Sequence, residues 1–187
     1  GIGLKFNETS LLFINSHLTS NKSGKADASV DKTTARNKSV GVILDSLFIG
    51  NPELDCLSQY NHVFFMGDLN FRVELGFDEA VRMVKEGKHL DMLQHDQLSV
   101  QRKNKLVLED WNEAPITFPP TYKYDVGNNT FNAKKRRTPS WVDRILWKSH
   151  PGTTIQCLEY NSDPSLSTSD HRPVYASFKL NTIRPYA

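Results

Sequence analysis

Short apolar runs that end abruptly in polar residues constrain the fold of this chain more than any other feature. Residues 62–73 read HVFFMGDLNFRV, in which four apolar residues end at Gly67 and are followed by Asp68 and Asn70. A short run rich in β-branched and aromatic residues and bounded by turn-forming residues is typical of a buried strand. Comparable runs beside polar residues are LLFINSHL (11–18), SWVDRILW (140–147) and TSDHRPVYASF (168–178).

Helical patterns alternate with these runs. Apolar residues at helical spacing occur between 40 and 48, and segments 77–87 and 89–103 predict two short amphipathic helices separated at Gly87. The polar, lysine-rich segment 19–39 is predicted to be a surface loop. The remaining predicted strands are a hairpin at the N-terminus and short segments at 116–118, 121–124, 142–147, 153–159 and 173–180. This alternation predicts a layered α/β protein whose sheets are covered by helices.

Length and charge limit the possible classes of function. A chain of 187 residues is long enough for one compact domain, and its net charge of +2 is too small to indicate a nucleic-acid binder. Cys56 and Cys157 match no metal-binding spacing, which favours a reducing compartment. No apolar run approaches the roughly 18 residues of a membrane span. A basic run, Lys134 to Arg137, is the one strong local concentration of charge.

The polar residues at the predicted strand ends include two histidines, three aspartates and two asparagines. Each one alone is an ordinary turn or surface residue. Together they form a chemically coherent set, because carboxylate and amide oxygens suit Mg²⁺. An aspartate can accept a proton from water, and a histidine supported by a second aspartate can stabilise a phosphoryl oxygen. The set therefore predicts metal-assisted hydrolysis of a phosphate ester. Its members are Asn15, His17, Asp68, Asn70, Asp143, Asp170 and His171.

A second group of residues could bind phosphate. The segments PPTYKYD and KKRRTPSW bring one tyrosine, two lysines and one arginine close in sequence, and lysine and arginine both bind phosphate oxygens. A basic run is commonly only a solvated loop. Here Pro139, Ser140 and Trp141 connect the run directly to a predicted core strand. The candidate residues are Tyr122, Lys123, Lys135 and Arg137.

Five motifs, which occur in a fixed order along the chain, relate it to a known protein family. NSHL, GDLNFRV, PTYKYD, RTPSWVDRILW and SDHRPV span nearly the whole chain. Together they resemble the inositol polyphosphate 5-phosphatases of the endonuclease/exonuclease/phosphatase superfamily, and further segments such as NSHLTS and HDQL favour the Src-homology-2-containing subgroup. The resemblance implies a deoxyribonuclease-I-like sandwich of two mixed β-sheets flanked by helices.

The resemblance also implies roles for the residues at the strand ends. Asp68 would activate the attacking water, and Asn70 would orient the water or bind the scissile phosphate. His171 would contact the 5-phosphate, with its ring held by Asp143. Asp170 would lie beside the metal.

Substrate-binding roles follow from the same resemblance. His17 and Asn15 would help to cradle the scissile phosphate. Four further residues match the family positions that recognise the neighbouring 4-phosphate, and these are Tyr122, Lys123, Lys135 and Arg137.

The implied activity is Mg²⁺-dependent removal of the 5-phosphate from phosphoinositides or soluble inositol polyphosphates. The enzyme would be cytoplasmic and would act peripherally at the cytosolic face of membranes, without binding nucleic acid. Residues 1–187 resemble only the C-terminal part of a single catalytic domain. The main glutamate ligand of the metal is expected upstream, so the isolated chain should have little or no activity.

Two alternatives stay open. One is a nuclease or other phosphodiesterase of the same superfamily, against which the PTYKYD and KxR motifs count because a nuclease reads no 4-phosphate. The other is a catalytically inactive phosphoinositide-binding module. The presence of Asp68, Asn70, Asp170 and His171 counts against loss of catalysis.

Overall fold

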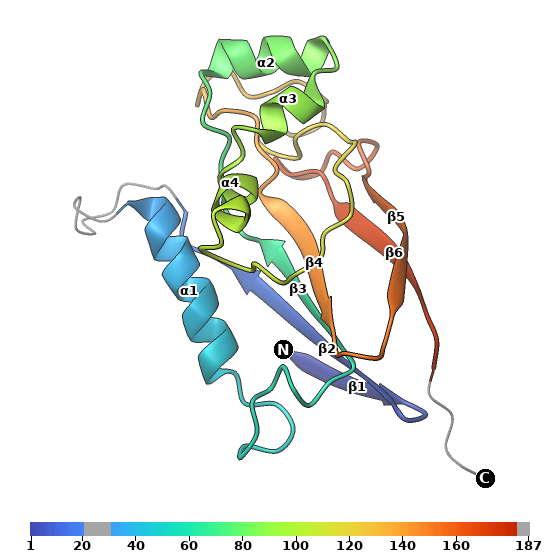
Figure 1. Cartoon of the computed structure of the whole chain (residues 1–187). Helices are drawn as coiled ribbons and strands as arrows, with labels where there is room; N and C mark the ends of the chain where they lie inside the picture. The colour runs from blue at the N-terminus through green and yellow to red at the C-terminus, as the bar shows by residue number, and fades with distance from the viewer. Residues whose placement is uncertain (21–30, 183–187) are drawn as a thin grey trace.

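Two β-sheets and four helices make up the computed structural model, which describes residues 1–20 and 31–182 (Figure 1). The strands are β1 (Ile2–Phe6), β2 (Thr9–His17), β3 (His62–Asp68), β4 (Asp143–Ser149), β5 (Ile155–Ser162) and β6 (Val174–Leu180). The helices are α1 (Lys32–Ser46), α2 (Phe77–Lys85), α3 (His89–Leu93) and α4 (Gln97–Lys103). The predicted α/β layering of sheets and helices is confirmed.

The register of the larger sheet places the polar strand ends in one row. This sheet has the order β1-β2-β3-β4, and β2 and β3 are parallel while the outer pairs are antiparallel. His17 at the end of β2 is opposite Asp68 at the end of β3, which is opposite Asp143 at the start of β4. Three residues far apart in sequence therefore meet at one edge of the sheet.

An aromatic cluster joins the two sheets. The ring of Phe64 stacks on Phe13 of the neighbouring strand at 4.9 Å between centroids. It also meets Phe178 of β6 edge-on at 5.0 Å, and Trp147 of β4 meets the same Phe178 at 5.0 Å. Such pairs prefer offset-stacked and edge-to-face arrangements, so they fix β6 against the larger sheet. The opposite face of β2 and β3 is buried beneath α1, where Leu12, Phe65 and Val40 share one apolar cluster (Figure 1).

Gly67 allows β2 and β3 to approach closely just before the row of polar residues. Its φ of +121° is a conformation that side chains rarely adopt, and a Cβ atom there would lie 2.1 Å from the Ser16 carbonyl oxygen. It would also lie 2.5 Å from Oδ1 of Asn15. Only glycine fits this position.

The predicted loop at 19–39 is wrong in its second half. Residues 21–30 lie outside the described residues, but α1 already begins at Lys32. The helix starts there because the Asp31 side chain accepts a hydrogen bond from the backbone N–H of Thr34. The segment looked like a loop because its polar residues hide the helical pattern, although Thr33, Arg36 and Val40 are buried.

The predicted strands at 116–118 and 121–124 are also absent from the described structure. Pro119 and Pro120 have no backbone N–H and cannot continue a ladder. Only isolated bridges form there, which pair Tyr122 with Ser140 and His171, and Tyr124 with Phe131. The predicted helix at 89–103 is divided, because Asp96 accepts from the N–H of Ser99 and caps the N-terminus of α4.

Candidate active site

A tight turn at the end of β3 holds the first two candidate residues. Oδ1 of Asp68 accepts a hydrogen bond from the backbone N–H of Asn70 at 3.0 Å. Asn70 is buried, has a φ of 57°, and donates from Nδ2 to the Leu18 carbonyl at 3.0 Å. Asparagine tolerates this left-handed conformation better than most residues. The turn fixes both side chains at the edge of the sheet.

Asp143 and His171 form the central pair of the site. Oδ2 of Asp143 lies 2.9 Å from Nδ1 of His171, and it also accepts a hydrogen bond from the Thr121 hydroxyl at 2.9 Å. Burial opposes protonation of His171, but the hydrogen bond and charge of Asp143, with Asp68 and Asp170, outweigh it and raise the pKa of the imidazole. The geometry therefore favours a protonated His171.

Asp68 faces this pair across the sheet edge. Burial and, after it, the charge of Asp143 raise the pKa of the Asp68 carboxyl. Its Oδ2 lies 3.3 Å from Nε2 of His17, an imidazole that is largely exposed. A carboxyl whose pKa is raised toward neutral pH is a better general base.

The carboxylates of this group could contribute to a cation site. Candidate ligand atoms of Asp68, Asp143 and His171 lie within 4.8 Å of one another, but a protonated His171 has no lone pair to offer, so only the two carboxylates could bind a cation. Two carboxylates fit part of the oxygen-rich shell that Mg²⁺ requires, so further ligands must come from elsewhere. Asp170, which was predicted beside the metal, forms an ion pair with Lys123 in the structure.

A cavity of about 310 Å³ opens beside these groups, and we call it the reaction cavity. It brings together candidates from the strand ends and from the phosphate-binding group. The ring of Tyr122 lies 4.6 Å from the imidazole of His171. The lining residues are His17, Ser20, Asp68, Asn70, Arg72, Tyr122, Lys123, Arg137, Asp170 and His171.

Three predicted site residues do not line the reaction cavity, namely Asn15, Asp143 and Lys135. Asn15 and Asp143 instead line a neighbouring cavity of about 360 Å³ together with Asp68 and His171. Lys135 is exposed and lines neither cavity. Among the described residues, the Lys135 side chain forms no hydrogen bond or ion pair with another candidate that would bring it into the site.

Three neighbouring residues that the sequence did not assign also support the site. Arg72 donates a hydrogen bond to Oδ1 of Asn70, and Thr121 holds the Asp143 carboxylate. Arg144, fully buried next to Asp143, pairs with Asp96 at 2.8 Å and with Glu113 at 2.6 Å. The position of Arg72, two residues after Asn70 at a strand end, was the only sequence signal.

The layered α/β architecture and the aspartate–histidine pair at the strand ends both point to one protein family. The chain belongs to the Endonuclease/Exonuclease/phosphatase family 2, whose family model matches residues 1–177.

Curated relatives include phosphatidylinositol 3,4,5-trisphosphate 5-phosphatase 1 of Xenopus laevis. It is 38% identical over 200 residues, which cover 100% of this chain and 19% of the relative. Phosphatidylinositol 3,4,5-trisphosphate 5-phosphatase 2 of Sus scrofa is 36% identical, with 100% of this chain and 15% of the relative covered. The chain thus spans less than a fifth of these proteins. The predicted resemblance to inositol 5-phosphatases is confirmed.

Two solved proteins of different kinds, a phosphatase domain and a nitrophorin, are similar to this chain in fold. The inositol polyphosphate 5-phosphatase domain of a synaptojanin, in complex with inositol (1,4)-bisphosphate and calcium ion, has a TM-score of 0.79 and 31% identity. The match covers 95% of this chain and 50% of that one. A Cimex nitrophorin ferrous NO complex has a TM-score of 0.71 and 27% identity, over 96% and 58% of the two chains. The fold alone therefore does not decide function.

Proposed function

We propose that this chain takes part in Mg²⁺-dependent hydrolysis of the 5-phosphate of phosphoinositides or inositol polyphosphates. The observation that carries the proposal is the contact between Asp143 and His171. Asp143 is also paired directly with Asp68 on the neighbouring strand β3. The relatives' names and the inositol bisphosphate in the synaptojanin structure support the choice of substrate class. We also propose that the chain is the C-terminal part of one catalytic domain.

The residues of this chain divide the chemistry between proton transfer and charge stabilisation. Asp68 takes the proton of the attacking water as the new P–O bond forms and the bond from phosphorus to the inositol oxygen breaks, and the inositol oxygen leaves as a hydroxyl after taking a proton from solvent water. The protonated imidazole of His171 donates to an oxygen of the phosphoryl group, and Asp143 holds the ring in position. Asn70, fixed by Leu18, orients the water or the phosphate.

Mg²⁺ fits this site in part. The carboxylate of Asp170, once released from Lys123, is the group of this chain that would hold it, because Asp68 acts as the base and Asp143 holds the His171 ring. When bound, the cation supplies Lewis-acid stabilisation of phosphoryl oxygens. Its remaining ligands, including the predicted glutamate, would come from outside this chain.

The proposal is tested by phosphate release from a complete catalytic domain that contains this chain. With Mg²⁺ present, we expect release from inositol 1,4,5-trisphosphate and none from inositol 1,4-bisphosphate, which has no 5-phosphate. The isolated chain should release little from either. Cleavage of DNA instead of release from the trisphosphate would favour the nuclease alternative. Binding of the trisphosphate without release, in the complete domain, would favour the inactive binding module.

Lys123 is expected to set selectivity for substrates with a 4-phosphate. It lines the reaction cavity and forms an ion pair with Asp170. Lys123→Ala should reduce the preference for 4,5- over 5-only phosphorylated substrates by about tenfold, because a hydrogen bond to a charged group is lost. Steady-state kcat/KM for both substrates measures this preference. Lys38→Ala, on the exposed face of α1, is the control, and an unchanged preference in Lys123→Ala would refute the assignment.

We propose further that the enzyme is cytoplasmic, acts at the cytosolic face of membranes and binds no nucleic acid. The exposed residues Lys134, Lys135 and Arg136 support the membrane part of this proposal, since each basic residue near an anionic membrane surface contributes about 1 kcal/mol to attraction. Among the described residues, no helix is both long and apolar enough to cross a bilayer.

A further inference from the structure

Arg172 is a buried cation next to His171 that the proposed chemistry does not use. The residue is 2% exposed. Within residues 1–20 and 31–182, no carboxylate oxygen lies within 4.0 Å of its guanidinium nitrogens. Burial of a charge without a charged partner is costly, so the contacts that Arg172 makes must offset that cost.

Four hydrogen bonds from this guanidinium join two separate parts of the chain. On one side, Nη1 donates to the carbonyl oxygens of Ser169 at 2.9 Å and of His171 at 3.3 Å. On the other side, Nε donates to Oδ1 of Asn129 at 2.9 Å, and Nη2 donates to the carbonyl oxygen of Asn128. The planar fork of arginine can hold both sides at once. It therefore ties the turn that carries His171 to the loop that carries Asn129.

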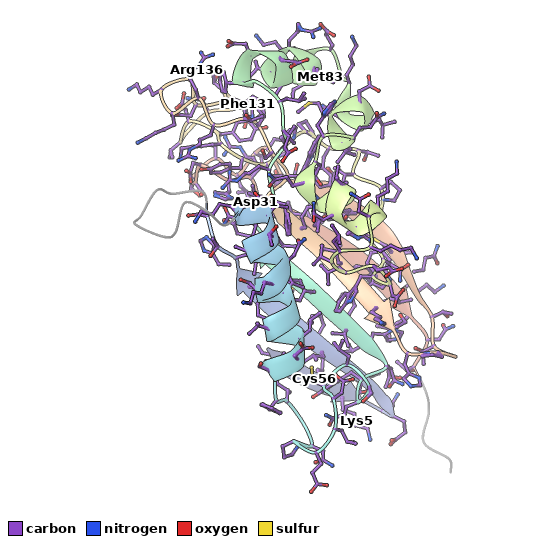
Figure 2. The ribbon with its side chains drawn as sticks, turned by 60° about the vertical axis from the view of Figure 1, so that its left-hand side comes forward. Lys5, Asp31, Cys56, Met83, Phe131 and Arg136 are labelled. Carbon is purple, nitrogen blue, oxygen red and sulfur yellow. The ribbon has the colours of Figure 1, made fainter. Side chains whose placement is uncertain are left out.

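The same guanidinium packs on an aromatic pair at the base of this loop. Its Cζ lies 4.2 Å from the centroid of the Tyr124 ring, which stacks on Phe131 at 4.4 Å between centroids. A guanidinium above an aromatic face is attracted to it, and more strongly when both are shielded from water. We call residues 125–132 the 125–132 loop. Phe131 lies toward the α2 end of the molecule, as does Arg136 (Figure 2).

The 125–132 loop connects residues that are predicted to recognise the 4-phosphate. It begins two residues after Lys123, and the backbone N–H of Asn132 at its far end donates to the Lys123 carbonyl oxygen at 2.9 Å. Arg137 follows five residues after Asn132, and both Lys123 and Arg137 line the reaction cavity. The position of the loop therefore influences where these two cationic groups lie.

The two sides that Arg172 joins differ in how firmly they are held by other contacts. The ring of His171 is fixed by Asp143, and its backbone forms a bridge with Tyr122. Residues 126–130 are exposed, so little packing holds that part of the loop. Loss of the Arg172 side chain should therefore free the loop more than it displaces His171.

We propose that Arg172 is a positioning residue for substrate selectivity, which holds the 125–132 loop, and through it Lys123 and Arg137, in place relative to His171 before substrate binds. The selectivity part of this proposal rests on the proposed function. Arg172 borders the neighbouring cavity but not the reaction cavity, so it acts on the substrate through the groups that it holds. A loop that is already ordered binds more tightly, because no entropy of ordering is lost on binding.

The test measures kcat and KM of a complete catalytic domain for inositol 1,4,5-trisphosphate and for inositol 1,5-bisphosphate, which has no 4-phosphate. Asn129→Ala removes one acceptor at an exposed position and leaves Arg172 in place, so the fold should survive. Arg172→Lys keeps the charge but lacks the fork that bonds both sides. KM for the trisphosphate should rise about twofold in Asn129→Ala and about threefold to tenfold in Arg172→Lys. KM for the bisphosphate should stay unchanged, and kcat should change by less than about twofold.

Arg102→Gln is the matched control for lost stability. Arg102 donates to Glu113 and to the carbonyl oxygens of Leu108 and Trp111, and it lines neither cavity. Its loss should lower Tm and leave the ratio of the two KM values unchanged. The proposal is overturned if Arg172→Lys likewise leaves this ratio unchanged, or lowers kcat for both compounds by one common factor. If Arg172→Lys does not fold, Asn129→Ala decides, and a wild-type KM ratio in that variant overturns the proposal.

Amide hydrogen exchange in the same domain, without substrate, tests the anchoring of the loop independently of the reaction. Both variants should speed exchange at residues 126–130 and leave β3 at the wild-type rate. Wild-type exchange at 126–130 in both variants would overturn the anchoring role. If the wild-type domain releases phosphate from neither compound, the proposed function fails instead, and hydrogen exchange alone then decides whether Arg172 anchors the loop.

Discussion

Asp68→Asn in a complete catalytic domain should reduce kcat by about 10²- to 10⁴-fold, because the substitution removes the base that accepts the proton of water. The geometry of the turn should survive, since an asparagine Oδ1 can still accept from the backbone N–H of Asn70. Phosphate release at saturating inositol 1,4,5-trisphosphate and Mg²⁺ measures the effect. KM should change less than kcat if the lost interaction belongs to the transition state.

The same substitution should make the folded chain more stable at neutral pH. The folded-state pKa of Asp68 is raised above its ordinary 3.8, so the ionised carboxylate opposes folding. This cost is absent below about pH 3.8 and grows as the pH rises through the folded-state pKa. Asp68→Asn removes the charge, and its gain in Tm should therefore shrink toward zero as the pH falls to that range.

Asp45→Asn, at an exposed position of α1, controls for the loss of one negative charge. It should change neither kcat nor the pH dependence of Tm. Wild-type kcat in Asp68→Asn would remove Asp68 from the role of base. A loss of Tm at pH 7 would show instead that the carboxylate stabilises the fold. A catalytic group is often held in an environment that destabilises its charged form. Replacing such a group typically lowers activity and raises stability.

The sequence predicted which strands end in polar residues better than it predicted the connections between the strands. Strand ends can be predicted from the sequence because an apolar run that stops at Gly67 and continues with Asp68 and Asn70 is typical of a strand followed by a turn. That His17, Asp68 and Asp143 would share a row depends on strand register, which is set by long-range pairing. The family resemblance predicted that these three residues lie close together, and the strand register is the physical reason why they do.

The errors have a common physical cause. The first turns of α1 are polar in sequence, yet they are helical because Asp31 caps them and Arg36 is buried against the body of the protein. Arg36 donates to the Thr19 carbonyl and to Gln97, which is distant in sequence. Local patterns cannot reveal contacts of this kind. Arg72 was left unassigned for the same reason, since its significance depends on Tyr122 and Arg137 beside it.

Asp143→Asn should reduce kcat at neutral pH by about 10- to 100-fold, because it removes the charge that positions and protonates His171. The pKa of His171 is raised above its ordinary 6.5 although burial opposes this, and Asp143 is the largest favourable influence. The protonated imidazole is present below the folded-state pKa and is lost as the pH rises through it. Removal of the Asp143 charge should therefore shift the alkaline limb of the kcat profile to lower pH.

The distinguishing result for Asp143→Asn is partial recovery of activity at acid pH, where the imidazole of His171 regains its proton without help from a carboxylate. A substitution that only disturbed the fold would lower the whole profile and leave its limbs in place. Thr121→Val is the matched control, because it removes the other hydrogen bond to Oδ2 of Asp143 but keeps the carboxylate charge. NMR titration of the His171 ring should show a lower pKa in Asp143→Asn than in Thr121→Val. Equal pKa values in the two variants would mean that Asp143 acts on His171 through packing and not through its charge.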